Sequence, residues 1–447
     1  MKRIALLALV AVIAISASTG GKTQRADACA FAVTPTAYEG PKDRSLDLAA
    51  MDLAAFNLIA PGNTNFGLPR LAKGPRQVRV SVEPVVPPIL LKSIGWIESS
   101  IDQTRNSPFG GIGPALISSD CGHGIMQITS GMTVPLGTGG NVTPEQLLVA
   151  THYAYNIARG AAMLAGKWND APASRPIAGT DTNGDPSIVE NWYFAVWSYN
   201  GFGGPGANRS NHPLDPVYAP WPRTPYSCGP TNDGFGHDRG KYPYQELVWG
   251  CAGHPPVVDG KQLWQPFDLT LPDLADAKWS GPLQLANWLA PYSKMDIPSP
   301  SPSHKDPTQR PSASAASAVL GSPKLDVYTS DISLSPSDKK TPASQDIELG
   351  NDGTGILVWG AVSSASWLTI SPSAGVALGP DVTCSAGTSC IRDGKLTLTV
   401  NPAKIPKGGG QATVTISSPQ TSEKKVLSVN LNGSTTGNTG IPGVTRN

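Results

Sequence analysis

The segment PPILLKSIGWIESSI, residues 87–101, decides how the first half of this chain is expected to fold. Leu91, Ile94 and Ile101 recur at helical spacing, and the proline at the first helical position favours a helix. Glu98 occupies a further position of the same apolar stripe. Burial disfavours the ionised carboxylate and raises its pKa, as a general acid requires near neutral pH. We predict that Glu98 is a proton donor, although an isolated glutamate beside such a stripe more often reaches solvent.

The N-terminus predicts export. Lys2-Arg3 precedes an apolar run over residues 4–15 and three small residues, which is the layout of a secretory signal peptide. We assign residues 1–28 to this signal and leave an earlier cleavage after Ser18 open. No later run is long and apolar enough to span a bilayer. The expected protein is secreted, either extracellular or associated with a cell wall.

The composition agrees with that location. Charged residues make up 15%, and 48 glycines and 43 prolines stand among 447 residues, with six cysteines, which is typical of a loop-rich extracellular protein. The cysteines offer two plausible local pairs and two left over: Cys228 with Cys251, Cys384 with Cys390, and then Cys29 and Cys121. Spacing does not fix their connectivity. The net charge of +1 provides no basic field for nucleic acid, and we expect a monomer.

A break in composition divides the chain. Residues 297–318 are rich in proline and serine and hold almost nothing apolar, which predicts an extended linker. Helical periods precede this linker and period-two alternation follows it, so we expect a mainly α domain and an all-β sandwich. The other predicted parts are an N-terminal extension (29–84), the helical domain (85–296) with an insertion (203–256), the β domain (319–435) and a disordered tail (436–447).

Two further helices are predicted in the helical domain. Thr143-Pro144-Glu145-Gln146 combines a capping threonine, a proline at the first position and a glutamine three residues on, and this helix is expected to continue through residues 156–160. The second is expected to open at Asp185-Pro186 and to end at Gly201.

Four blocks now carry a family resemblance. They are Glu98-Ser99, Gly124-Ile125-Met126-Gln127, Asn156 to Gly160, and Ala195 to Gly201. In this order they resemble the soluble lytic transglycosylase domain of the lysozyme-like superfamily, over roughly residues 85–205. The resemblance implies a lysozyme-like fold and peptidoglycan glycan strands as the partner, with no cofactor.

The resemblance also implies a mechanism. Glu98 would protonate the glycosidic oxygen between N-acetylmuramic acid and N-acetylglucosamine, and the 2-acetamido group would stabilise the positive charge. The ionised carboxylate would then accept a proton from the C6 hydroxyl as that oxygen attacks C1, giving a 1,6-anhydro product. Asp102 and Asp120 are the nearest candidates for the second carboxylate of an ordinary glycosidase, and a solvent-facing or capping role is the preferred interpretation for both.

The other site residues take supporting roles by the same resemblance. Gln127 would bond the sugar, Met126 would pack below it, and Tyr199 would lie close to Glu98 and help to orient it, although core packing is an alternative for Met126 and Tyr199. Ser118 and Asn200 complete the predicted substrate-binding set. The predicted structural positions are Gly124, Asn156, Gly160 and Gly201.

Three segments depart from the family pattern, and the first is the extra length at residues 109–114 between Glu98 and Gln127. Asp181-Thr182-Asn183-Gly184-Asp185 spaces oxygen atoms as a calcium loop does, but glycine and glutamate are absent where such a loop needs them, so a turn is preferred and no metal site is predicted. Residues 203–256 are rich in aromatic residues, which suit either a wall of the glycan groove or ordinary core packing.

The β domain shows period-two alternation in five segments, at 324–328, 355–359, 395–400, 411–416 and 426–430. Residues 351–355 and 366–375 resemble the BACON-type immunoglobulin-like modules of secreted bacterial proteins. Trp367 is expected in the core of this sandwich. The resemblance suggests carbohydrate binding or a spacer role.

Two alternatives to a lytic transglycosylase stay open. A goose-type lysozyme or related glycoside hydrolase on the same fold would release reducing ends instead of anhydro sugars. A catalytically silent protein that binds the cell wall belongs to a different class.

Overall fold

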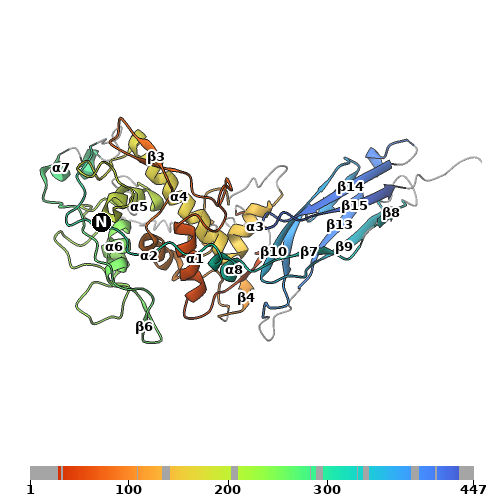
Figure 1. Cartoon of the computed structure of the whole chain (residues 1–447), viewed down its shortest axis with the longest axis horizontal. Helices are drawn as coiled ribbons and strands as arrows, with labels where there is room; N and C mark the ends of the chain where they lie inside the picture. Colours follow the sequence, from red (N-terminus) through yellow and green to blue (C-terminus); the bar gives the residue numbers. More distant parts are fainter. Residues whose placement is uncertain are drawn as a thin grey trace, which may run out of the picture.

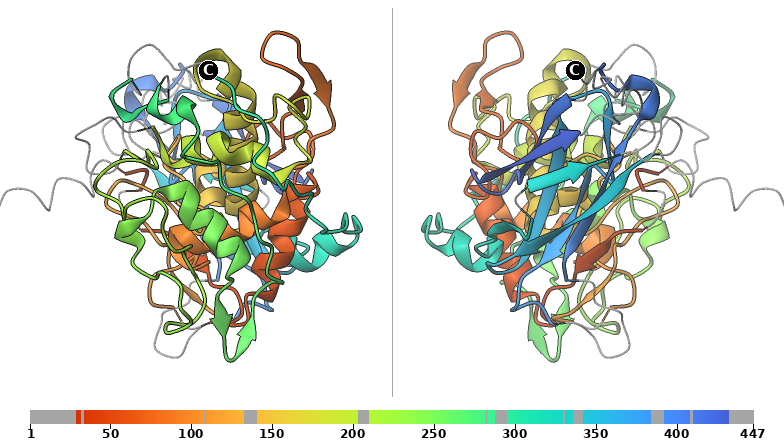
Figure 2. Two further views of the ribbon diagram at one scale, coloured as in Figure 1. Left: turned by 90° about the vertical axis from the view of Figure 1, so that its left-hand side faces the viewer. Right: turned by 90° about the vertical axis from the view of Figure 1, so that its right-hand side faces the viewer.

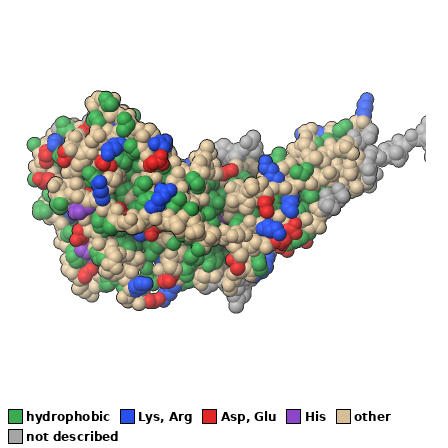
Figure 3. Space-filling model, viewed as in Figure 1, with side chains coloured by type: hydrophobic (Ala, Val, Ile, Leu, Met, Phe, Trp, Pro, Cys, Tyr) green, Lys and Arg blue, Asp and Glu red, His purple; other side chains and the backbone are tan. Residues whose placement is uncertain are grey.

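The computed structural model describes residues 29–31, 34–107, 109–132, 141–202, 210–281, 283–287, 295–329, 331–335, 342–383, 392–407 and 410–431. The predicted signal peptide, the Cys384–Cys390 pair and the C-terminal tail lie outside these residues. The chain forms a helical lobe followed by an elongated β-sandwich (Figure 1). Charged side chains of both signs are scattered over both lobes on the face shown in Figure 3. No helix of the described chain is long and apolar enough to cross a bilayer.

Six helices build the first lobe around a common core. They are α1 (Ser45–Ala55), α2 (Pro88–Ser99), α3 (Pro144–Thr151), α4 (Tyr153–Ser174), α5 (Tyr193–Asn200) and α6 (Tyr244–Gly253). Short strand pairs lie at the edges of this lobe: β1 (Thr36–Tyr38) with β4 (Ile112–Pro114), β2 (Leu71–Lys73) with β3 (Val80–Val82), and β5 (Val257–Val258) with β6 (Lys261–Gln262). The smaller helical turns are η3 (Val189–Trp192), η4 (Arg239–Lys241), α7 (Ala277–Ser280) and η5 (Leu285–Asn287).

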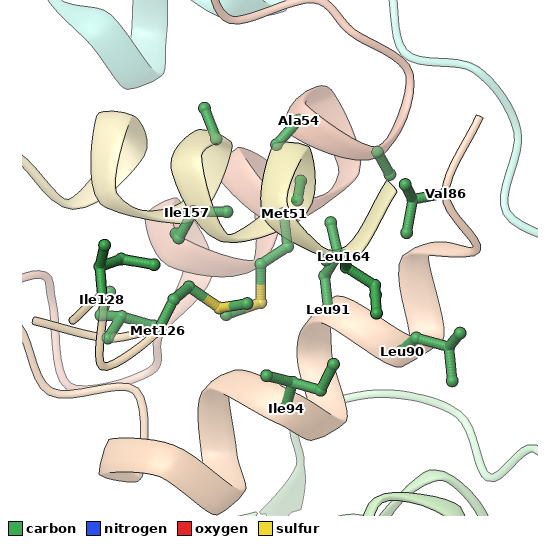
Figure 4. Packing of buried hydrophobic residues seen from close by; sticks show 14 of the residues in the cluster. Met51, Ala54, Val86, Leu90, Leu91, Ile94, Met126, Ile128, Ile157 and Leu164 are labelled. Carbon is green, nitrogen blue, oxygen red and sulfur yellow. The ribbon is translucent and has the colours of Figure 1, made fainter. Parts of the chain in front are cut away.

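The core lies where α1, α2 and α4 meet. Met51 of α1, Leu91 of α2 and Leu164 of α4 are fully buried and converge there (Figure 4). Each such side chain contributes about 1.5–3 kcal/mol on burial. Gly95 permits the contact between α1 and α2, because a Cβ at this position would lie 2.5 Å from Cε of Met51. Packing against α1 therefore fixes the helix that carries Glu98.

The predicted helix through residues 143–160 is in fact two helices. Thr143 forms the expected capping box with Gln146, but α3 ends at Thr151 and α4 begins at Tyr153. His152 between them is extended and buried, and its ring stacks on the Tyr153 ring at 5.4 Å. Neighbouring residues do not face each other in a continuous helix, so this packing requires the break.

Two other predicted helix boundaries were wrong. The helix expected at Asp185 starts only at Val189, because the Asp185 carboxylate binds the Ser187 amide in a turn and Lys73 at 2.7 Å. The α2 helix ends at Ser99, so Ile101 lies beyond it with a φ of 62°. Ile101 is nevertheless fully buried, which explains why it fitted the apolar pattern.

The predicted linker is extended over most of its length, but it is docked on the helical lobe. Ile297 forms a parallel bridge with Ala178, and the backbone N–H of Val189 donates to the carbonyl of His304. The buried Glu190 carboxylate accepts bonds from the His304 backbone and ring at 2.7 and 2.6 Å. The segment then forms α8 (Ala315–Leu320), which packs on α1. Hydrogen bonds thus attach this segment to the helical lobe, although it has little apolar surface to bury.

The C-terminal lobe is a sandwich of two sheets, as predicted. One sheet has the order β12-β10-β14-β15-β8 and the other β11-β13-β9-β7. Leu396, Leu398 and Val400 of β13 alternate into a core that also holds Trp359 and Trp367. The strands are β7 (Leu325–Val327), β8 (Asp331–Leu334), β9 (Ser344–Asn351), β10 (Ile356–Ser363), β11 (Leu368–Ser371), β12 (Ala374–Leu378), β13 (Gly394–Val400), β14 (Gly410–Ser417) and β15 (Lys424–Leu431), with a helical turn η6 (Pro402–Lys404).

The two lobes share an apolar interface. Ile356 and Val358 of β10 and Leu378 of β12 pack into the core of the helical lobe, next to α3. Gly360 lies so close to Pro144 that a Cβ would stand 2.6 Å from the Pro144 Cγ. The right-hand view of Figure 2 shows the sandwich strands crossing in front of the helices. The sandwich is therefore seated on the helical lobe.

Candidate active site

Glu98 lies in the last turn of α2, where α6 packs against that helix. The hydroxyl of Tyr244, the first residue of α6, donates to Oε1 of Glu98 at 2.6 Å. Glu98 is partly buried, and Tyr244 is almost completely buried. The hydrogen bond from Tyr244 therefore fixes the orientation of the Glu98 carboxyl group.

The surroundings of Glu98 keep its proton available near neutral pH. Burial raises the pKa of Glu98 to about 7, against the opposing effects of the Tyr244 hydrogen bond and the positive charge of Arg239. The exposed carboxylate of Asp120 adds a smaller upward effect. A carboxyl group with a pKa near ambient pH donates and accepts a proton with similar ease.

The chain turns sharply directly after this helix. Ser100 and Ile101 both have left-handed φ angles, 60° and 62°, and for a β-branched residue this conformation costs on the order of 1–3 kcal/mol. The buried Glu39 carboxylate holds the next residues by accepting the backbone N–H groups of Gln103 and Thr104 at 3.1 and 2.9 Å. The strained turn is thus fixed on both sides of its bend.

A second loop lies beside the end of α2. Gly124 and Gln127 of this loop have positive φ angles. The Ser99 hydroxyl donates to the Ile125 carbonyl at 2.9 Å and so connects the loop to the helix. Asn156 on α4 accepts from the Met126 N–H at 2.8 Å and donates to the His123 carbonyl at 2.7 Å. The loop over residues 124–127 is therefore anchored to both α2 and α4.

Met126 and Gln127 differ in exposure within this loop. Met126 is fully buried against Gly160, where a Cβ would lie 2.7 Å from the Met126 Cγ. Gln127 is partly exposed, and its side-chain amide donates to the Gly124 carbonyl at 2.8 Å. Gln127 is thus the more accessible of the two side chains, whereas Met126 packs in the core.

The predicted Tyr199 lies near Glu98 but bonds elsewhere. Its hydroxyl donates to the Met126 carbonyl at 2.9 Å, and burial and the negative charge of Glu98 raise its pKa well above the ordinary value. Asn200 accepts a bond from the Asn211 side chain at 2.8 Å, and Gly201 caps α5 with a φ of 105°. Direct contact with the Glu98 carboxyl comes from Tyr244.

Neither candidate for a second carboxylate is free of other partners. Asp102 forms an ion pair with the buried Arg44. Asp120 accepts the Ser118 hydroxyl at 2.5 Å, in a loop that a disulfide from Cys121 to Cys29 holds in place. Both carboxylates are thus held by other residues of the protein.

The remaining sequence predictions concern metal and aromatic residues. Asp181 accepts the Ser299 N–H at 2.7 Å, and in the described chain no cluster of three acidic, histidine or cysteine residues is placed to hold a metal. A disulfide joins Cys228 to Cys251, as the local pairing predicted. Most aromatic residues of the insertion pack in the core, namely Tyr218, Tyr226, Tyr242, Tyr244 and Trp249, whereas Phe235 is exposed.

Sequence reasoning missed Tyr244 and Arg239 as neighbours of Glu98. Both lie in the insertion, at least 140 positions beyond the helix that they approach. Pro243 directly before a helical pattern was the available signal, because proline favours a helix start. It marks where α6 begins but not which helix α6 contacts.

Comparison with known proteins identifies the second lobe. Residues 330–429 match the family model of the viral BACON domain, in agreement with the predicted BACON-type module. No curated protein matches the chain. Similar solved structures include the ASH/PapD-like domain 7 of human CEP192, with 15% identity over 30% of this chain and 94% of that chain (TM-score 0.19). Another is a FixG-related protein from Vibrio parahaemolyticus, with 4% identity over 26% of this chain and 97% of that chain (TM-score 0.18).

Proposed function

We propose that this chain is a secreted peptidoglycan lytic transglycosylase that uses Glu98 as its single acid and base. The observation that carries the proposal is the hydrogen-bonded Glu98 carboxyl, with a pKa raised to about 7 at the end of α2. The order of the four transglycosylase-like blocks supports the same conclusion.

The proposed reaction uses one carboxyl group in two steps. Protonated Glu98 gives its proton to the glycosidic oxygen as the bond to C1 of the muramic acid breaks. The resulting carboxylate accepts the proton of the C6 hydroxyl while that oxygen bonds to C1. A 1,6-anhydro sugar and a free N-acetylglucosamine end result, and Glu98 regains its proton.

The local contacts suit this role. Tyr244 donates to one carboxyl oxygen, Oε1, at 2.6 Å and thereby orients the group. Arg239, whose guanidinium binds the Ile97 carbonyl, places a positive charge near the carboxylate formed in the first step. Partly exposed Gln127 offers an amide to the sugar.

Replacement of Glu98 tests the proposal. Glu98→Gln should lower turnover of purified peptidoglycan by on the order of 10²–10⁴-fold while retaining binding to glycan strands. Asp120→Asn is the matched control and should retain most of the activity, because Asp120 is exposed and paired with Ser118. Equal losses in both variants would favour a two-carboxylate hydrolase, and unchanged lysis by Glu98→Gln would refute the assignment.

A further inference from the structure

A cleft with unpaired positive charge lies along α4, on a side of the lobe to which the proposed chemistry gives no role. One cavity of about 540 Å³ opens between α4 and residues 62–69, and a second of about 200 Å³ lies beside it. Ser130 and Arg159 line both cavities. We refer to the two together as the α4 cleft.

The far wall of this cleft is firmly built. The side-chain oxygen of Asn63 accepts hydrogen bonds from the backbone N–H groups of Asn65 and Phe66 at 2.8 and 3.2 Å. The side-chain oxygen of Asn57 accepts a hydrogen bond from the backbone N–H of Leu68 at 2.9 Å. Asn169 of α4 binds the next segment by accepting the Ala72 N–H at 2.9 Å. The N-terminal extension thus forms a fixed wall opposite α4.

Arg159 is a cation in the wall of both cavities. Its guanidinium is partly buried and donates to the Asn65 carbonyl at 3.1 Å, and within the described chain no carboxylate forms an ion pair with it. Arginine presents several donors in a planar fork that matches a carboxylate. Glu145 and Asp170 also line the two cavities, but neither forms an ion pair with Arg159. The partly buried guanidinium is therefore left to pair with an anionic group of a ligand.

The cleft is linked to the proposed site through Tyr199. The Tyr199 hydroxyl donates to the Met126 carbonyl, and Met126 packs against Gly160, the residue after Arg159. The charges of both Glu98 and Arg159 act on this hydroxyl. Ser130 follows Gln127 by three residues in the same loop. A ligand held in the α4 cleft would thus lie next to the loop that carries Gln127.

We infer that the α4 cleft binds the peptide stem of peptidoglycan, with Arg159 pairing with a carboxylate of that stem; this inference rests on the proposed function. The sugars of a peptide-substituted glycan carry no charge, whereas the stem carries carboxylates. Lys167 lines the same cavity eight residues after Arg159, about 12 Å along the helix. That distance equals three to four extended peptide residues, at about 3.3–3.6 Å each.

Binding of a free stem peptide tests the inference without turnover. The probe is a tetrapeptide of L-alanine, D-glutamate, a diamino acid and D-alanine, measured by calorimetry against the full-length Glu98→Gln protein. Adding Arg159→Gln should weaken binding about tenfold, which corresponds to about 1.4 kcal/mol. Adding Lys404→Gln, an exposed cation of the sandwich, should change nothing. A peptide with both carboxylates amidated should also bind about tenfold more weakly.

Activity separates the inference from the proposed function. Arg159→Gln alone should lower kcat/KM on peptide-bearing strands but not on strands stripped of peptide, and Arg159→Lys should restore part of the loss. Equal kinetics of wild type and Arg159→Gln on both substrates, or equal binding of the acidic and amidated peptides, would overturn the inference and leave the function standing. Failure of the wild type to cleave either substrate would instead refute the proposed function.

Discussion

The helical lobe buries charged side chains, whereas the sandwich core excludes them. Glu39, Arg44 and Asp47 are among the buried charged residues of the first lobe, and Glu190 and Glu246 are others. In the described part of the sandwich the buried polar residues are the uncharged Asn351 and Ser418. Burying charge is costly, so groups of this kind mark where a fold supports chemistry or fixes a specific conformation. The proposed chemistry accordingly belongs to the lobe that buries charged groups.

Two glutamates of the helical lobe, Glu98 and Glu246, differ in their hydrogen-bond partners. Burial raises the pKa of both Glu98 and Glu246 to about 7. Glu246 forms a two-point ion pair with Arg223 at 2.9 and 3.0 Å, and both side chains are about 4% exposed. Glu98 has a tyrosine hydroxyl as its hydrogen-bond partner instead. Glu246 is therefore held by a charged partner, whereas the partner of Glu98 is a neutral hydroxyl, as the proposed proton transfer requires.

The largest expected effect comes from breaking the structural pair. Arg223→Ala should destabilise the helical lobe by about 3–5 kcal/mol, because it leaves Glu246 buried without its partner. Denaturant unfolding measures the loss. Lys404→Ala in the sandwich is the control and should stay within about 0.5 kcal/mol of wild type. A loss below about 1 kcal/mol for Arg223→Ala would mean that the pair is not a structural element.

A cavity in the sandwich should act differently. Leu398→Ala removes a fully buried side chain from β13 and should cost about 2–5 kcal/mol. The pH profile of peptidoglycan cleavage should not move, because the sandwich supplies no titrating group to Glu98. A shifted profile would show that the two lobes are coupled through their interface.

The smallest expected effect is a shift in pH dependence. Activity should fall as pH rises through about 7, since the protonated acid is lost there. The Tyr244 hydrogen bond lowers the pKa of Glu98, so Tyr244→Phe should move this alkaline limb to higher pH. The pH profile of kcat/KM provides the measurement. A shift to lower pH would show that Tyr244 does not stabilise the ionised carboxylate.

The same group links pH to stability. The folded-state pKa of Glu98 lies above its ordinary value of 4.5, so the neutral form favours folding. This contribution is complete below about pH 4.5 and is lost as pH rises toward about 7. The proposed site is thus less stable at the alkaline end of its working range.

Local patterns predicted the elements better than their contacts. The capping box at Thr143, the proline start of α2 and the alternation of β13 were all visible, because each depends on neighbouring residues. The break at His152 was not, since ring packing overrides the helical preference there. Docking of residues 297–318 also escaped prediction, because it depends on polar bonds to distant residues such as Glu190.

The contacts of the proposed site divide in the same way between those visible in the sequence and those that were not. Glu98 interrupted an apolar pattern and could be found from its own helix. Tyr244 could not, because its approach to Glu98 depends on how an irregular insertion folds back on α2. Tyr199 was predicted to lie close to Glu98 and to orient it, but the Tyr199 hydroxyl donates its hydrogen bond to the Met126 carbonyl instead.

The mass of the products tests the central claim most directly. Wild-type protein is incubated with purified peptidoglycan, and the soluble fragments are analysed by mass spectrometry. A single acid and base at Glu98 predicts fragments that end in 1,6-anhydro-N-acetylmuramic acid. Fragments heavier by one water, with reducing ends, would show hydrolysis and contradict the account.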